Sequence, residues 1–133
     1  MPAATRTYAP DIAALERLAD AALTRLPERF RALMGGVVLR VVEEAEDEVL
    51  AELGLETPYE LTGLYSGRSL REGSAWASGE LPPMIHLYRR PLLLEWVETG
   101  VSLEELITHV IVHEVGHHFG LSDEDMHALE EQA

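Results

Sequence analysis

The 133-residue sequence contains no cysteine, so disulfide bonds and zinc sites made of thiolates are excluded. It contains no lysine either. Its ten arginines are outnumbered by 24 acidic residues, which gives a formal net charge of −14. Such an excess of negative charge opposes binding to the phosphate backbone of a nucleic acid or to an anionic lipid surface. The sequence therefore predicts neither a nucleic-acid partner nor a membrane partner.

Long apolar runs are also missing. No stretch approaches the roughly 20 apolar residues that a transmembrane helix needs. Met1–Pro10 lacks the apolar core of a secretory signal, and we expect it to be a flexible leader in a cytoplasmic protein. A length of 133 residues is sufficient for one hydrophobic core, so we expect a single domain over residues 1–133.

Hydrophobic spacing and end signals predict the order of the elements. Helices are expected in five segments, Asp11–Leu26, Asp47–Leu53, Pro91–Thr99, Ser102–Phe119 and Asp123–Glu131. Strands are expected in three shorter segments, Val37–Glu43, Leu61–Tyr65 and Met84–Arg90. The stretch Ser66–Pro83 is rich in glycine, proline and serine, and we expect a loop beside the functional cleft, anchored by Trp76.

A short segment near the end of the chain contains the residues that point to chemistry. On a helix, His113 and His117 lie on one face, so their imidazoles can close on one Zn²⁺ ion. Glu114 flanks such an ion, where it can take a proton from zinc-bound water. Gly120 can end the helix and turn the chain so that Asp123 supplies a third ligand. Asp123 also has an ordinary alternative role, as an acidic residue in the first turn of the next helix.

The run His-Glu-Val-Gly-His-His-Phe-Gly-Leu-Ser-Asp at 113–123, with Leu-Tyr-Arg-Arg-Pro at 87–91, resembles a family of small bacterial zincin-like metallopeptidases. The similarity extends from Leu61 to Met126. It implies an α+β fold, a compact zincin-like domain with a small mixed sheet packed on helices and the active-site helix near the C-terminus. It also implies a Zn²⁺ cofactor and a peptidase function. The run is similar to the zinc signature of larger metzincins too, but Met126 lies too close to Asp123 to be taken as their methionine turn.

The expected reaction is therefore peptide hydrolysis by a zinc-activated water, with Glu114 as the general base. By the same resemblance, Met84–Arg90 is expected at the edge of the sheet, where an extended peptide or protein substrate pairs with its backbone. Four side chains are candidates for contacting the substrate or the developing oxyanion, namely Tyr88, His86, Tyr65 and Arg89.

Two other functions stay open at this point. A chain this short has little material for specificity pockets, which favours a metal- or peptide-binding module without catalysis. One family of zinc-dependent endoribonucleases has the same ligand spacing, but with glycine in place of Glu114 and histidine in place of Asp123, and the negative charge disfavours RNA. His109, one helical turn before His113, is expected to be an exposed side chain rather than a spare ligand.

Overall fold

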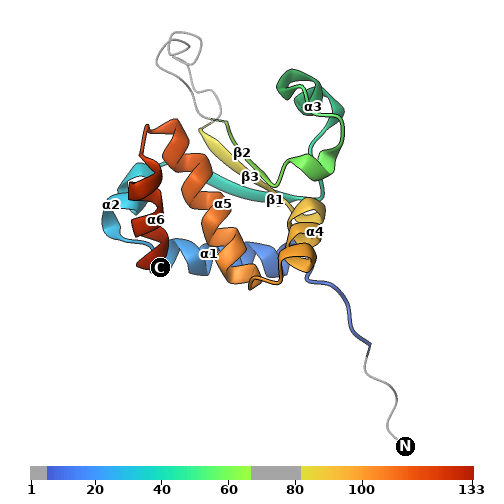
Figure 1. Ribbon diagram of the computed structural model, residues 1–133, viewed down its shortest axis with the longest axis horizontal. Coiled ribbons are helices and arrows are strands. Elements are labelled where there is room, and N and C mark those ends of the chain that lie inside the picture. The colour runs from blue at the N-terminus through green and yellow to red at the C-terminus, as the bar shows by residue number, and fades with distance from the viewer. Residues whose placement is uncertain (1–5, 67–81) are drawn as a thin grey trace, which may run out of the picture.

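A computed structural model of the chain describes residues 6–66 and 82–133, so most of the expected loop, with Trp76, lies outside the described residues. The described residues form six α-helices, one 3₁₀-helix and three strands (Figure 1). In chain order they are α1 Ile12–Arg25, α2 Glu28–Leu33, β1 Val38–Val42, α3 Asp47–Leu53, η1 Pro58–Glu60, β2 Gly63–Ser66, β3 Met84–Tyr88, α4 Arg89–Thr99, α5 Leu103–His118 and α6 Asp123–Glu131. No helix in these two ranges is long and apolar enough to span a bilayer.

The three strands form a mixed sheet in the order β1–β3–β2. β1 runs parallel to β3, and β2 runs antiparallel to it. β3 is therefore the central strand, and the expectation that Met84–Arg90 lies at the edge of the sheet is wrong. Both rows of its backbone hydrogen-bonding groups already face neighbouring strands. The strand also ends at Tyr88, because Arg89 begins α4.

The sheet packs on helices, which confirms the expected α+β fold. One face, together with α1, α2 and α5, forms the main hydrophobic core, whose fully buried side chains include Leu15, Phe30, Ile85, Leu87, Ile107 and Ile111. The other face of the sheet carries a smaller cluster of Ala45, Leu50 and Tyr88, in which Leu50 comes from α3. Figure 1 shows α5 crossing the sheet, with α6 beside it.

The chain reverses direction between α5 and α6. α5 ends at His118, and the backbone of Gly120 has a φ of 74°, in the left-handed region that favours glycine. The Leu121 N–H then donates a hydrogen bond to the Gly116 carbonyl at 2.9 Å. Ser122 caps the start of α6. The turn expected at Gly120 is therefore confirmed.

α6 packs directly against the backbone of α5. A Cβ atom at Gly116 would lie 2.5 Å from the sulfur of Met126 and 2.8 Å from its Cγ atom, so glycine is what allows the two helices to come this close. Met126 is fully buried and Leu129 is 3% exposed. This contact fixes the position of the residue after Leu129, which is Glu130, relative to α5.

Candidate metal centre

α5 carries three histidines at four-residue intervals, His109, His113 and His117. Each residue of a helix turns by about 100°, so successive members of this row shift by about 40° around the helix axis. The ring centroids of His109 and His113 are 4.0 Å apart, and those of His113 and His117 are 5.7 Å apart. His113 is therefore the middle of a short row, with a different histidine on each side.

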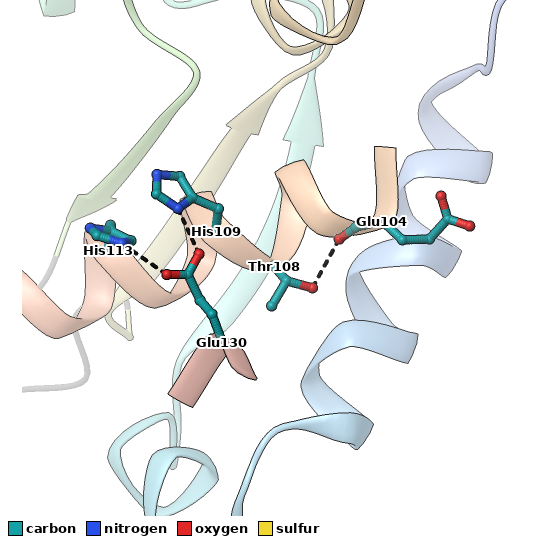
Figure 2. Close-up of polar contacts among 5 residues, drawn as sticks. All are labelled: Glu104, Thr108, His109, His113 and Glu130. Carbon is teal, nitrogen blue, oxygen red and sulfur yellow. Dashed lines mark hydrogen bonds and ion pairs between the residues drawn. The ribbon is translucent and has the colours of Figure 1, made fainter. Parts of the chain in front are cut away.

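On one side of this row, Glu130 of α6 contacts two of the histidines (Figure 2). Its Oε1 atom is 2.6 Å from His109 Nδ1, and its Oε2 atom is 3.2 Å from His113 Nε2. Among residues 6–66 and 82–133, this is the one group of three or more histidine and acidic side chains whose ligand atoms all lie within 4.8 Å of one another. These three side chains can therefore hold a metal ion.

The sequence prediction does not include Glu130, and it expects His109 to be only an exposed side chain. The His109 side chain is indeed 51% exposed, but it is also the closer of the two partners of Glu130. The four-residue spacing of His109 and His113 was a usable signal. The place of Glu130, 17 residues after His113, depends on how α6 packs on α5, and no local pattern indicates it.

A cleft of about 890 Å³ lies beside this group. Its walls include His109, His113 and Glu130, and also Asp123. Several further lining residues are acidic, namely Glu104, Glu105 and Glu131. The cleft gives a cation a route to the ring nitrogens, and its negative walls favour a positively charged ligand.

Glu114 lies on the other side of the row, toward His117. Its carboxylate is partly buried and accepts a hydrogen bond from the backbone N–H of Tyr65 in β2. Burial raises the pKa of the Glu114 carboxyl above its ordinary value, while His117 and the Tyr65 N–H partly oppose this shift. The Tyr65 ring packs on His118, with ring centroids 4.2 Å apart. The candidate base is thus held between the histidine row and the sheet, with a pKa that favours accepting a proton.

Tyr88 and His86 lie on the same face of β3, with nearly parallel rings whose centroids are 6.2 Å apart. Burial raises the pKa of the Tyr88 hydroxyl, and the charges of Glu46 and Glu114 raise it further. Burial lowers the pKa of the His86 imidazole, and Arg40 lowers it further, while Glu46 opposes this. Tyr88 is therefore a neutral hydroxyl within electrostatic reach of Glu114.

Arg89 has partners of a different kind. Its Nε atom donates to the Pro10 carbonyl at 2.7 Å, and its Nη1 atom donates to the Glu43 carboxylate at 3.0 Å. These contacts tie the start of α4 to the segment before α1 and to the end of β1. They account for the Arg89 side chain without a role beside Glu114.

The predicted zinc ligands His113, His117 and Asp123 are brought together in part. The rings of His113 and His117 are close to perpendicular, with 79° between their planes, and Asp123 lines the same cleft as His113. Asp123 is the exposed first residue of α6. Among the described residues, these three side chains do not form a group within 4.8 Å as His109, His113 and Glu130 do. The ligand set His113, His117 and Asp123 stays a prediction.

The chemistry of both sets suits zinc. Imidazole nitrogen and carboxylate oxygen are ordinary zinc ligands, with bonds of about 2.0–2.2 Å. Two ligand atoms on a tetrahedral zinc ion are then about 3.3 Å apart. The distance of 3.2 Å between Glu130 Oε2 and His113 Nε2 is close to that separation, whereas the distance of 2.6 Å between Glu130 Oε1 and His109 Nδ1 is shorter, so these two side chains would move apart slightly around an ion. The side chains present on α5 and α6 therefore fit a zinc ion.

Comparison with protein families matches residues 34–133, about three quarters of the chain, to a family described as zincin-like metallopeptidase. The matched range includes the whole sheet as well as α5 and α6. The resemblance inferred from the run at 113–123 is therefore confirmed. A comparison with individual curated proteins finds no match.

Proposed function

The chain belongs to the zincin-like metallopeptidase family, and on that premise we propose that it hydrolyses peptide bonds with a zinc ion on α5 and Glu114 as the general base. The observation that carries this proposal is the position of Glu114. Its carboxylate is next to His113 in the chain, partly buried, and oriented by the Tyr65 N–H. A base beside a metal ligand, with a pKa raised by burial, accepts a proton more readily than an exposed carboxylate does.

We assign the zinc ligands of this reaction to His113, His117 and Asp123. Glu114 is displaced by about 100° from His113 around the helix axis, on the side of His117. The influence of His117 on the pKa of Glu114 supports this placement. An ion on the His117 side therefore has the base beside it. When bound, zinc supplies Lewis-acid activation of water and of the scissile carbonyl.

The protein's own groups then have distinct roles. Glu114 accepts a proton as the attack begins and later passes it to the leaving amine, while the Tyr65 N–H keeps the carboxylate in orientation. Among the four candidates for the oxyanion contact, we favour Tyr88, because its pKa is raised by burial and because the charges that raise it further include that of Glu114. A hydroxyl that stays protonated can donate a hydrogen bond to developing negative charge.

The substrate, a peptide or protein, is proposed to pair with β2 instead of β3. The Tyr88 N–H donates to the Thr62 carbonyl at 2.9 Å, so the backbone groups of Thr62 face β3. In an antiparallel pair the facing residues alternate, so the backbone groups of Gly63 and Tyr65 point away from β3. The Tyr65 N–H on this outer edge meets Glu114. A peptide strand added to β2 would therefore run past the base.

Replacing the base tests the mechanism directly. Glu114→Gln keeps the size of the side chain but removes its ability to accept a proton. We expect the rate of peptide hydrolysis by the zinc-loaded variant to fall by about 10²–10⁴-fold, with the zinc content unchanged. Initial rates on a broad peptide library, with metal analysis of the same samples, measure both quantities. Glu124→Gln, an exposed residue of α6, is the matched control and is expected to keep the wild-type rate.

Two outcomes would contradict the proposal. Undiminished hydrolysis by Glu114→Gln would show that this carboxylate is not the base. Tight zinc binding by the wild-type chain, with no cleavage of any peptide in the library, would favour a metal-binding module without hydrolytic activity.

A further inference from the structure

The contact of Glu130 with two histidines is not used by the proposed mechanism. Each oxygen of its carboxylate has its own partner, His109 for Oε1 and His113 for Oε2. The Glu130 side chain is only 21% exposed. A partly buried carboxylate between two imidazoles can accept hydrogen bonds from their N–H groups. The same three side chains can instead bind a cation.

The three side chains are held in place by a rigid pair of helices. The spacing along α5 sets the two rings, whose centroids are 4.0 Å apart. Met126 and Leu129 are both buried, Met126 against Gly116 of α5, and they fix the last turn of α6 that carries Glu130. Sites built on packed helices keep their ligand atoms in position without the bound ion.

This position is separated from the catalytic base. His109 is displaced by about 40° from His113 around the axis of α5, and Glu114 is displaced by about 100° in the opposite direction. An ion between His109 and Glu130 therefore lies on the far side of the histidine row from Glu114. It is therefore farther from Glu114 than an ion held by His113 and His117, and we expect it not to support the hydrolysis proposed above.

We propose that His109, His113 and Glu130, here called the Glu130 site, bind a divalent cation such as Zn²⁺ in a second, non-catalytic position. Two imidazoles and a carboxylate form a donor set that zinc accepts, and the acidic cleft leads to it. Binding at the Glu130 site is independent of Glu114, whereas its consequence for catalysis rests on the proposed function.

The consequence follows from the shared ligand. His113 belongs to both ligand sets, so a chain holds one ion in either position. The division of bound zinc between the two positions is then set by their relative affinities and does not depend on the zinc concentration. We expect one zinc ion per wild-type chain, even with zinc in excess of the protein.

The test removes the two ligands that belong only to the catalytic position. Full-length chain carrying both His117→Asn and Asp123→Asn is titrated with zinc against a chromophoric chelator. Both residues are exposed, so the fold should be retained, and circular dichroism checks this. We expect this double variant to bind one zinc ion per chain and to hydrolyse no peptide.

A third substitution in the same background identifies the site. Glu130→Gln should weaken zinc binding by more than about 100-fold, since losing even an outer partner of a metal site weakens binding by about 10- to 100-fold. Glu124→Gln is the matched control, because Glu124 is an exposed residue of the same helix and does not line the cleft. It should leave the zinc affinity unchanged.

The outcomes separate the two proposals. Absence of zinc binding in the folded double variant, or binding that Glu130→Gln leaves unchanged, overturns the Glu130 site. Peptide hydrolysis retained by the double variant would overturn the non-catalytic assignment and the proposed ligand set together. Hydrolysis by the wild-type chain that does not respond to Glu114→Gln, with Glu130-dependent zinc binding intact, would overturn the proposed function alone.

Discussion

Two carboxylates flank His113, and different parts of the molecule hold them. Glu114 follows His113 on α5 and is oriented by the Tyr65 N–H of the sheet. Glu130 comes from α6, and each of its oxygens contacts an imidazole. The pKa of Glu114 is raised by burial, which prepares it to accept a proton. Under the two proposals, the same functional group serves proton transfer or cation binding according to the elements that surround it.

The largest effect is expected on the Glu114 side, from Tyr88→Phe. If the Tyr88 hydroxyl donates to the developing oxyanion, its loss should lower the rate of peptide hydrolysis by about 10²–10³-fold. Zinc binding, including that of the Glu130 site, should not change. Tyr59→Phe is the matched control, because Tyr59 is 46% exposed on η1. The rate of peptide hydrolysis and the zinc affinity are measured for both variants. A loss of zinc affinity in Tyr88→Phe as large as its loss of rate would point to a structural role instead.

The next effect concerns the packing that supports the Glu130 side. Met126 is fully buried between α6 and α5, so Met126→Ala should lower the free energy of unfolding by about 2–5 kcal/mol, as measured by urea denaturation. Glu124→Ala, on the exposed face of α6, should change it by less than about 0.5 kcal/mol. A stability of Met126→Ala equal to that of wild type would mean that α6 does not depend on this contact.

A smaller change is expected from Gly116→Ala. The added Cβ atom would lie 2.5 Å from the Met126 sulfur, and the crowding should lower the free energy of unfolding by about 1–3 kcal/mol. Gly35→Ala is the control, because a Cβ there meets only the Ala32 carbonyl at 3.4 Å and φ lies outside the left-handed region. That control should be neutral or stabilising by up to about 1 kcal/mol. Equal behaviour of the two variants would contradict the close approach of the helices.

The smallest effect is a pH dependence at His86, away from both carboxylates. Burial lowers the pKa of His86 in the folded chain below its ordinary value of 6.5. As the pH falls through 6.5, the unfolded chain therefore binds a proton at His86 more readily than the folded chain does. Stability should therefore fall as pH drops through 6.5, and His86→Asn should lose less stability over that range. Urea denaturation at pH 8 and pH 5.5 measures this loss of stability for the wild-type chain and for His86→Asn. A titration midpoint of His86 at or above 6.5, by NMR, would contradict the expected direction.

Local signals in the sequence were sufficient for five of the six α-helices in the described residues, but not for α2, and for part of the site. Asp11 and Pro27 mark the ends of a helix that the structure places at Ile12–Arg25. The spacing of His113 and His117 and the turn at Gly120 were predictable for the same reason, since helix periodicity and glycine conformation involve only neighbouring residues.

Strand order was not predictable in this way. The segment Met84–Tyr88 was recognisable as a strand, but its central position depends on pairing with Val38–Val42 and with Gly63–Ser66, which are distant in the sequence. A strand with one free side and a strand with none can have the same side-chain pattern. The edge position expected for Met84–Arg90 was therefore wrong, and the proposal places the substrate at β2 instead.

The sequence by itself determined which residues share a face of α5 and where that helix ends, because those features follow from residue spacing and backbone conformation. Only the tertiary structure decided that Glu130 lies against His109 and His113, 21 and 17 residues away, and that Glu114 meets the Tyr65 N–H. Contacts between elements depend on how buried surfaces such as Met126 against Gly116 fit together, and residue spacing carries no record of that fit.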